Sequence, residues 1–496
     1  MGGKQLDRVR LRFTGLTAYT AMLLMTVTGL AFTVLITRRL TPEELGVWRY
    51  LGTLINYFII PAWLLGFWAT RLTAKGENIL KTLLTTTATT SAAATALFLI
   101  MAETFSRPTG SPAIIFAAAA LEIPSIYVYT SLESVAHAKK PHINYYAQLV
   151  QEFLKIPIAV LLVIMLRLGL LGAVAATIAA FAARAATLLY LMKDIEWGRF
   201  SARLVKRMIS AAWLPLYQSG AGALLALDTV IVILLVGSSE PAGYLAAVLL
   251  LGSVVSMSGT LAAGLYPKML QESSGKDVET SLSLVLMMAV PTSAGILILG
   301  APLLNILRPE YAAAADTLPF VVVLAYLSIV SSIMDSVIAG TERVDYGDTL
   351  SFKDLVKSRL FMLPSLSYIQ SFVYLPSLMA ALYITHPSQP TDVVMVWIAV
   401  NTAILTPFIV YKTKIARRLI RFQVPAKNIA SYILAAVFLG IAALLTKPEK
   451  LSVEVVPAIM QVMPSVLIGA AAYFAVLAAI NREFRELARA VMKTLF

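Results

Sequence analysis

Residues 33–58 read TVLITRRLTPEELGVWRYLGTLINYF, and residues 229–255 read TVIVILLVGSSEPAGYLAAVLLLGSVV. Each stretch contains the end of an apolar helix, a short polar turn and the start of a second apolar helix. Glu43 and Gly46 of the first stretch align with the Glu and the Gly of SEPAG in the second, at an offset of 197 residues. This repeat predicts two halves of similar structure and the same orientation.

The composition predicts a membrane protein. Apolar residues make up 59% of the 496 residues, charged residues make up 14%, and the mean hydropathy is +0.80, whereas an ordinary soluble domain has about 25% charged residues. Apolar runs of about 20 residues can cross a hydrocarbon core of about 30 Å. We therefore predict an all-α polytopic membrane protein with about fourteen transmembrane helices. They lie near 14–37, 45–69, 80–102, 112–136, 143–166, 168–192, 213–237, 243–267, 281–304, 313–338, 360–384, 391–411, 428–446 and 456–480.

The distribution of Lys and Arg predicts the orientation. With a cytoplasmic N-terminus, 30 of the 40 Lys and Arg residues fall in inner segments and only seven in outer segments. Positive charge accumulates on the cytoplasmic side of membrane proteins. We therefore expect a multi-pass protein of the plasma membrane, with both termini and the loop 339–359 in the cytoplasm.

The repeat also predicts the domain organisation, with two parallel halves related by an axis along the membrane normal. In the linker between them, Phe200, Leu204 and Met208 recur at four-residue spacing beside several Arg and Lys residues. This pattern is typical of a helix in the anionic inner interface. The predicted parts are a six-helix lobe at 1–197, an interfacial linker helix at 198–212, a second six-helix lobe at 213–411, and two additional helices with a cytoplasmic tail at 412–496.

Several classes of function are excluded or disfavoured by the composition. The chain has no Cys, and its three His residues lack the spacing of metal ligands. We expect no cofactor and no metal. The net charge of +13 follows the membrane topology, so it does not indicate nucleic acid as a partner. The outer loops are short and carry only scattered acidic residues, which disfavours an enzyme.

Ionisable residues inside predicted spans are candidates for a site, because each costs about 2.5–3.5 kcal/mol at the bilayer centre on insertion scales. Four spans of the first half carry polar residues on one helical face. We predict that these faces line one water-filled cleft. The four stripes are Gln148, Gln151, Glu152 and Lys155; Glu122, Ser125, Tyr129 and Glu133; Arg49, Thr53 and Asn56; and Thr177, Arg184 and Thr187.

Other interpretations stay open for some of these residues. Glu152 and Lys155 can pair on one helix and serve packing alone. Arg49 lies near the outer boundary and can extend its charge to the interface. Glu122 can be a protonated, hydrogen-bonded core residue.

The second half has no Lys or Arg inside its predicted spans, and its charges there are acidic. Asp316 and Asp335 lie toward the ends of their spans, so we expect them to be solvated. Asp228 lies about sixteen residues into the span 213–237. It must be neutral, paired with a first-half cation, or bound to Na⁺ or H⁺, and it is our candidate for ion coupling.

Two stretches carry a family resemblance. LITRRLTPEELGVWRYLGTLINYF, residues 35–58, has an R-x-L-x-x-x-x-x-G rhythm after a first apolar helix. It resembles the opening of the polysaccharide-biosynthesis flippases of the multidrug/oligosaccharidyl-lipid/polysaccharide exporter superfamily. Residues 226–248, ALDTVIVILLVGSSEPAGYLAAV, look like the seventh and eighth helices of that family. The resemblance implies a two-lobed core of twelve helices with two more, alternating access, and a lipid-linked sugar as cargo.

Together these observations predict a flippase, not an enzyme. It moves an oligosaccharide, linked to polyprenyl or dolichyl phosphate or pyrophosphate, from the inner to the outer leaflet. Its partners are this cargo, membrane lipids and other membrane proteins of polysaccharide assembly. Arg and Lys suit a pyrophosphate, and carboxylates and amides suit sugar hydroxyls. The candidate substrate-binding residues are Lys155, Arg184, Arg49, Glu152, Gln148, Gln151 and Glu122.

Three alternatives remain. The acidic second half favours a proton- or sodium-coupled multidrug exporter of the same superfamily, although Lys155 and Arg184 oppose a cavity for cations. A membrane enzyme of glycan assembly would need a carboxylate or His constellation near an outer loop. A scaffold without transport activity would leave the polar stripes unexplained.

Overall fold

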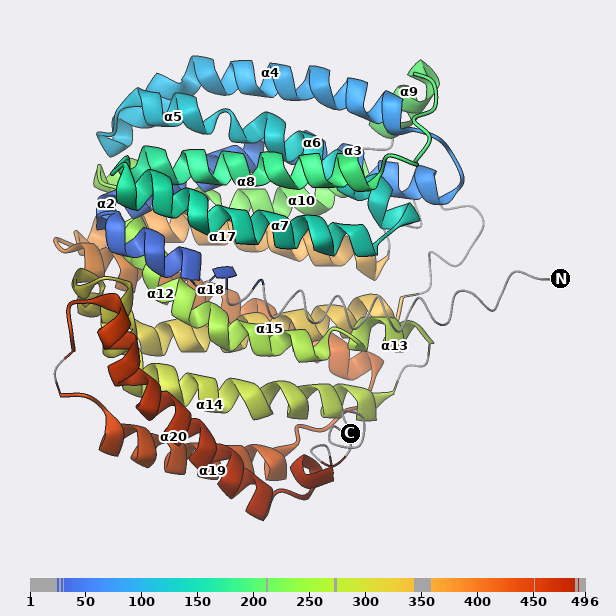
Figure 1. Cartoon of the computed structure of the whole chain (residues 1–496). Helices are drawn as coiled ribbons and strands as arrows, with labels where there is room; N and C mark the ends of the chain where they lie inside the picture. Colours follow the sequence, from blue (N-terminus) through green and yellow to red (C-terminus); the bar gives the residue numbers. More distant parts are fainter. Residues whose placement is uncertain are drawn as a thin grey trace. The chain divides into compact units, whose positions relative to one another are not determined.

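A computed structural model describes residues 25, 28–29, 31–210, 213–271, 274–342, 358–449, 451–486 and 489. In these ranges all regular secondary structure is helical (Figure 1). They contain twelve helices long and apolar enough to cross a membrane, or thirteen if one bent pair counts as a span. The protein is therefore an all-helical polytopic membrane protein. The count of fourteen stays a prediction, because the predicted span 14–37 falls largely outside the described residues; residues 31–39 are helical.

The chain forms two compact units, Met1–Gly243 and Tyr244–Phe496. The lobe boundaries predicted from the repeat stay a prediction. The helices of unit 1 are α2 (Pro42–Phe58), α3 (Ile60–Ala74), α4 (Leu80–Ser106), α5 (Ala113–Ala119), α6 (Glu122–Lys139), α7 (His142–Ala159), α8 (Gly169–Leu191), α9 (Ala202–Ser210), α10 (Trp213–Leu225) and α11 (Leu227–Val236), with a 3₁₀ turn at Arg107–Thr109. Those that follow are α12 (Glu240–Met257), α13 (Leu265–Gln271), α14 (Gly275–Leu307), α15 (Leu318–Gly340), α17 (Arg359–Thr385), α18 (Pro390–Leu419), α19 (Ala426–Thr446) and α20 (Val455–Ile480), with 3₁₀ segments at Ser258–Ala262 and Pro309–Thr317.

The start of α2 is fixed by local hydrogen bonds. The Thr41 hydroxyl accepts from the Glu44 amide at 3.2 Å, and the Glu44 carboxylate accepts from the Thr41 amide at 2.9 Å. This reciprocal cap satisfies amides that have no partner inside the helix. The predicted span 45–69 is not one straight helix, because α2 and α3 meet at an angle of 52°. Pro61, in the first turn of α3, has no amide to donate back to α2.

The repeated Glu and Gly residues form a close crossing between the N-terminal ends of α2 and α12. A Cβ added to Gly46 would lie 1.8 Å from the carbonyl oxygen of Ser239, and one added to Gly243 would lie 1.9 Å from that of Pro42. Residues 42 and 46 correspond to 239 and 243 at the offset of 197, so the two contacts are reciprocal. The repeat read from the sequence thus has a structural counterpart, and only glycine fits at both positions.

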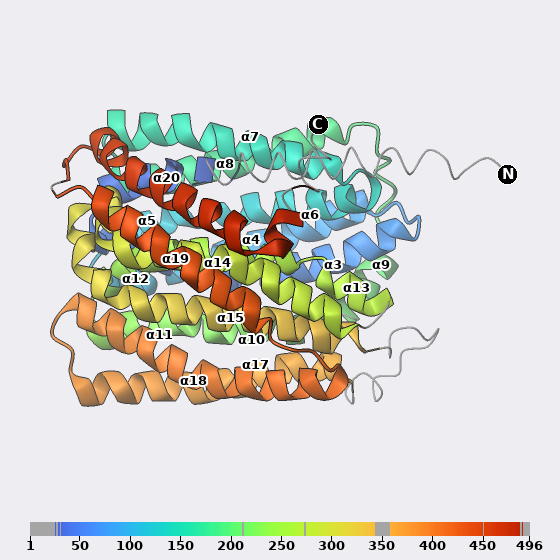
Figure 2. The same ribbon diagram turned by 90° about the horizontal axis from the view of Figure 1, so that it is seen from below.

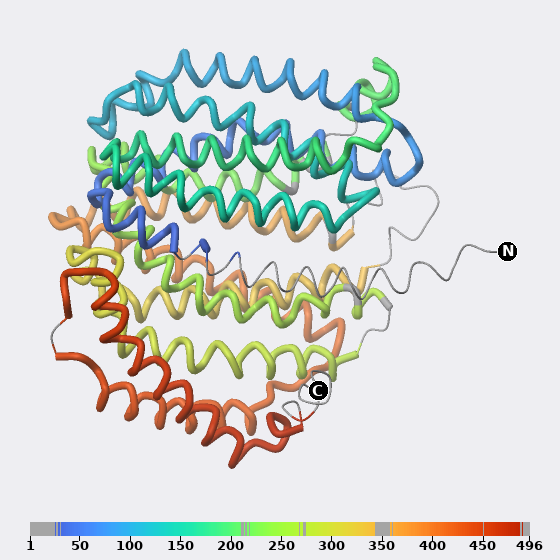
Figure 3. Tube along the Cα trace, in the orientation of Figure 1, coloured from blue at the N-terminus to red at the C-terminus, as the bar shows by residue number. Residues whose placement is uncertain are grey.

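Within unit 1, helices α3, α4, α6 and α8 share a core that includes Leu83, Leu132 and Leu188. Figure 1 shows α7 lying beside α8, with α6 on the other side of α8. Helix α7 contains Pro157 and continues as a π-helical segment, Val160–Met165, before the chain turns into α8 (Figure 3). A proline lacks an amide proton, and the hydrogen-bond register widens downstream of it. These packed helices position the polar side chains described below.

In the predicted linker 198–212, the structure describes a short helix, α9. Its Met208 is buried in the core of unit 1, whereas Phe200 and Ile209 are exposed. The segment is also attached by its backbone, because the Ser201 amide donates to the Thr82 hydroxyl at 3.0 Å. Its position at a membrane interface stays a prediction.

In unit 2, helices α14, α19 and α20 lie together (Figure 2). Their shared core includes Met287, Tyr432, Leu439 and Tyr473. The Tyr473 hydroxyl donates to the Met287 carbonyl at 2.7 Å. Helices α15 and α18 pack against each other elsewhere in the unit. The predicted span 391–411 is too short, because α18 continues to Leu419.

Candidate functional site

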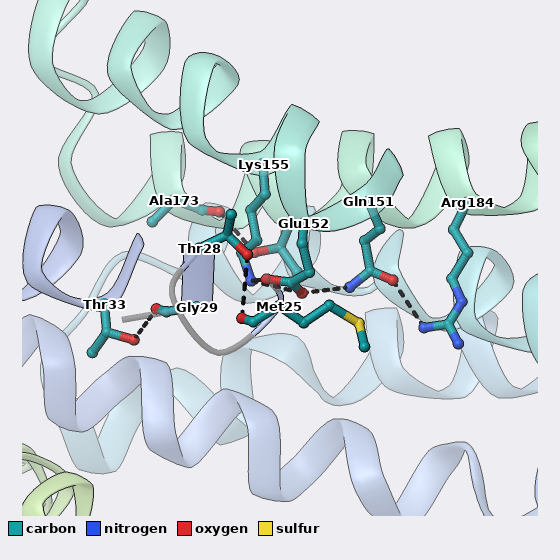
Figure 4. Close-up of polar contacts among 10 residues, drawn as sticks. Met25, Thr28, Gly29, Thr33, Gln151, Glu152, Lys155, Ala173 and Arg184 are labelled. Carbon is teal, nitrogen blue, oxygen red and sulfur yellow. Dashed lines mark hydrogen bonds and ion pairs between the residues drawn. The ribbon is translucent and has the colours of Figure 1, made fainter. Parts of the chain in front are cut away.

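Helices α6, α7 and α8 bring five polar side chains into one network inside unit 1. Arg184 on α8 donates from Nη2 to Glu133 Oε1 at 2.8 Å and from Nη1 to Gln151 Oε1 at 2.9 Å. Gln151 donates to Glu152 Oε1 at 3.3 Å, and the Lys155 ammonium lies 2.9 Å from Glu152 Oε2. Figure 4 shows the row from Arg184 through Gln151 and Glu152 to Lys155. We call these five residues the Arg184 network.

The network is largely removed from solvent. The exposed fractions of the side chains are 10% for Arg184, 15% for Lys155 and 12% for Glu152, and only Glu133 reaches 32%. Each cation also faces an aromatic ring. The Lys155 Nζ lies 4.3 Å from the Phe32 ring centroid, and the Arg184 Cζ lies 4.5 Å from that of Tyr129. Ring faces stabilise cations that have lost water.

The network is electrically balanced, with two carboxylates and two cations. Removing one partner of such a buried pair leaves an uncompensated charge, which costs about 3–5 kcal/mol. Arg184 retains unused donor capacity: its Nε is buried and has no hydrogen-bond partner among the described residues.

A pocket of about 330 Å³ adjoins the network. Glu122 lies in its wall, and no described residue hydrogen-bonds its carboxyl group. Tyr129 belongs to both features, because it lines the pocket and also underlies the Arg184 guanidinium. The pocket therefore combines aromatic surfaces with one unpaired acid beside a cationic network. Its lining residues are Trp48, Leu51, Gly52, Ile55, Asn56, Ile59, Trp63, Glu122, Ile126, Tyr129, Val174, Thr177 and Phe181.

The structure brings together only part of the predicted cleft. Glu133, Gln151, Glu152, Lys155 and Arg184 form the network. Gln148 is half-buried on α7 and takes no part in the hydrogen bonds of the described residues. The pairing of Glu152 with Lys155, left open by the sequence, is present.

The polar stripe on α2 contributes one residue to the pocket. Asn56 lines it, and Arg49 and Thr53 do not. The Thr53 hydroxyl instead donates to the Arg49 carbonyl at 3.1 Å, along its own helix. Arg49 thus stays a candidate on its sequence alone.

Asp228 lies in the first turn of α11, two residues after a single-residue turn at Ala226 that separates α10 from α11. Residues Ser219–Val236 together are long and apolar enough to cross a membrane, so Asp228 lies within a candidate span. The Thr229 hydroxyl donates to its Oδ1 at 3.1 Å. Its role in ion coupling stays a prediction.

Unit 2 contains a buried ion pair that the sequence analysis missed. The Lys412 ammonium on α18 lies 2.9 Å from Asp335 of α15 and 3.0 Å from the Ser331 hydroxyl. The expectation of a second half without cations in its spans was wrong, because α18 extends past the apolar window and buries Lys412. Asp335 is paired as well as partly solvated. Asp316 is exposed, as predicted.

No model of a known protein family matches the sequence, and no curated protein matches it. Solved structures do match. The chain is similar to the lipid II flippase MurJ in an inward-closed conformation, with 12% sequence identity, 95% of this chain and 99% of that chain covered, and a TM-score of 0.63. It is also similar to an inward-facing multidrug resistance MATE family transporter of the MOP superfamily, with 14% identity, 80% and 95% covered, and a TM-score of 0.56.

These comparisons define the class of fold. At this identity the likeness concerns the fold alone, and the chain shares the fold of these two solved proteins. The all-helical, polytopic fold implied by the sequence resemblance is thus confirmed, and the division into two six-helix lobes with two further helices stays a prediction.

Proposed function

We propose that the protein is a flippase that moves a lipid-linked oligosaccharide from the inner to the outer leaflet. The observation that carries the proposal is the Arg184 network, a buried group with two cations beside an aromatic pocket. The similarity to the lipid II flippase MurJ supports a lipid-linked cargo. A diphosphate on a polyprenyl or dolichyl chain suits the guanidinium of Arg184 and the ammonium of Lys155.

In this proposal the pocket holds part of the glycan. Trp48, Trp63 and Tyr129 offer flat apolar surfaces, and Glu122 and Asn56 offer groups that can bond sugar hydroxyls. Gln148 and Arg49 are further candidate contacts. The acyl chain of the cargo stays in the surrounding lipid.

Transport proceeds by alternating access. The lobes 1–197 and 213–411 rock about the linker 198–212, and residues 412–496 add two helices and a tail. Both termini face the cytoplasm at the plasma membrane, where other polysaccharide-assembly proteins are partners. Two negative charges leaving a negative interior gain about 4–5 kcal/mol at 100 mV, at about 2.3 kcal/mol per charge. Export therefore runs downhill electrically, and Asp228 serves to reset the empty protein.

Deletion of the gene tests this function. We expect a lipid-linked glycan to accumulate on the cytoplasmic face of the membrane, and the wild-type gene to restore its export. An unchanged distribution of lipid-linked glycans between the leaflets would contradict the proposal. The accumulated glycan would also identify the sugar.

One observation favours a second function, the export of organic cations. An unpaired carboxyl among aromatic rings, as at Glu122, is a combination that binds ammonium groups. The MATE family transporter of similar fold is a multidrug resistance protein. If this function is correct, wild-type cells resist organic cations such as ethidium, and Glu122→Gln removes that resistance without a change in lipid-linked glycans.

A further inference from the structure

The two buried ion pairs occupy equivalent places in the two halves of the chain. In the predicted repeat, α6 corresponds to α15 and α8 corresponds to α18. The cations Arg184 and Lys412 each lie seven residues before the end of their helix. The acids Glu133 and Asp335 lie six and five residues before the ends of theirs. Each half therefore holds a carboxylate on its fourth predicted span and a cation on its sixth, at matching depth.

The two pairs also share an unusual distribution of exposure. The cation is deep, with 10% of the Arg184 side chain and 8% of the Lys412 side chain exposed. The carboxylate is shallower, with 32% exposed for Glu133 and 36% for Asp335. A carboxylate that faces lipid is costly, so the exposed side of each carboxylate is a side that a polar ligand or water can occupy. Each carboxylate is thus covered by its cation on one side and accessible on another.

We propose that Lys412 is a second binding position for the phosphate groups of the cargo, equivalent to Arg184, and that Asp335 and Glu133 are internal anions that the cargo phosphate displaces. This inference rests on the proposed flippase function. The ligand class is a prenyl phosphate or diphosphate. In the empty protein the carboxylate keeps the buried cation paired, and in the loaded protein the phosphate takes its place.

The local chemistry supports such an exchange. A buried cation without a partner is strongly destabilising, so an empty anion site built on Lys412 needs an internal counter-ion. The Ser331 hydroxyl remains beside Lys412 in either state and can donate to a phosphate oxygen. Asp335 can rotate away from Lys412 toward its exposed side, because 36% of its side chain is already exposed. The displaced carboxylate is then solvated, so no charge is left buried and unpaired.

The alternative is that the pair serves packing alone, and the two roles predict opposite results for Asp335→Asn. If Asp335 is a displaceable anion, its removal eliminates a competitor, and Asp335→Asn should bind a prenyl diphosphate several-fold more tightly than the wild type. If the pair is structural, the same change leaves affinity unchanged or lowers it. Asp316→Asn, at an exposed acid of the same unit, is the matched control and should leave affinity unchanged.

The experiment titrates the purified full-length protein in detergent with farnesyl diphosphate, and uses farnesol as the ligand that lacks phosphate. Lys412→Gln should weaken binding of the diphosphate at least tenfold, as expected for one charged hydrogen bond, and should leave farnesol unaffected. Lys412→Arg should retain most of the affinity. The double variant Asp335→Asn, Lys412→Gln keeps the charge balanced, so it folds even if Lys412→Gln alone does not.

The outcomes separate this inference from the proposed function. Wild-type protein that binds farnesyl diphosphate no better than farnesol would contradict both. The assignment of Lys412 alone would be overturned if the wild type prefers the diphosphate to farnesol but one of two further results is found. These are wild-type affinity in the double variant, or weaker binding by Asp335→Asn than by the wild type. Tighter binding by Asp335→Asn, together with binding weaker than wild type in the double variant, supports it.

Discussion

The buried polar side chains of unit 1 outnumber those around the ion pair of unit 2, but both units contain a cation paired with a carboxylate. Unit 1 has a five-residue network across three helices and an adjoining aromatic pocket. Among the described residues of unit 2, the equivalent place holds Lys412, Asp335 and Ser331. The repeated halves have thus kept a cation–carboxylate pair at the same depth, and only the first has Gln151, Glu152 and Lys155 around it. We infer that the pair serves a task common to both halves, and that discrimination of the cargo belongs to unit 1.

The largest effect is expected at Arg184. Arg184→Ala leaves Glu133 without its cation and removes the link to Gln151, so it should destabilise the protein by about 3–5 kcal/mol. The double variant Glu133→Gln, Arg184→Gln removes both charges and should recover most of this loss. Thermal unfolding in detergent measures the stability of the single and the double variant. Equal destabilisation by the single and double changes would show that packing, and not charge balance, explains this pair.

The crossing of α2 and α12 should be nearly as sensitive. Gly46→Ala places a methyl group against a backbone carbonyl that cannot move as a side chain can, and overpacking of this kind costs about 1–3 kcal/mol or more. Gly243→Ala should cost a similar amount, because the contact is reciprocal. Gly52→Ala is the control on the same helix, since no atom lies within 4 Å of the added Cβ. The account of the crossing fails if all three variants unfold at the same temperature.

Lys155 tests the difference between unit 1 and unit 2, because no residue described in unit 2 corresponds to it. If Lys155 binds the cargo diphosphate, Lys155→Gln should weaken binding by about 1.5–3 kcal/mol, and Lys155→Arg should be tolerated better. If it only balances Glu152, the double variant Glu152→Gln, Lys155→Gln should bind the cargo as the wild type does. Titration with farnesyl diphosphate distinguishes the two roles.

The smallest effect is expected at an ion pair outside the membrane-spanning helices. In the segment after α8, the hydrogen bonds from Lys140 hold the pKa of the Asp194 carboxyl below its ordinary value. A lowered pKa contributes stability above the ordinary value, about 3.9 for Asp, and this is lost as the pH falls through the lowered value. Because the Asp194 side chain is exposed and exposed ion pairs contribute little, Asp194→Asn should leave the unfolding temperature at neutral pH nearly unchanged. A loss as large as that of Arg184→Ala would contradict our distinction between buried and exposed pairs.

Much of the fold follows from the sequence for simple physical reasons. Spans are readable because each needs about 20 apolar residues, and Gly46 with its aligned partner marks the repeat. The bend before Pro61 and the interruption at Ala226 were not predicted, because an apolar window is insensitive to breaks in helical hydrogen bonding.

The site was less predictable. The face shared by Gln151, Glu152 and Lys155 follows from helical periodicity, but the pairing of Arg184 with Glu133 depends on how two helices are rotated against each other. Lys412 was assigned to a loop because it lies just after the apolar window of its helix. The two pairs are also spaced differently along the chain, 77 residues for Asp335 and Lys412 and 51 for Glu133 and Arg184, so an alignment at the fixed offset of 197 does not find the second pair.

Flipping of a fluorescent lipid-linked oligosaccharide in proteoliposomes tests the central claim most directly. The wild type should make inner-leaflet cargo accessible to an external quencher. The charge-balanced double variant Glu133→Gln, Arg184→Gln should remain folded but lose most of this activity, because the cation that binds the diphosphate is gone. Wild-type flipping by that folded variant, or no flipping by the wild type, would contradict the claim that these buried cations carry a lipid-linked cargo.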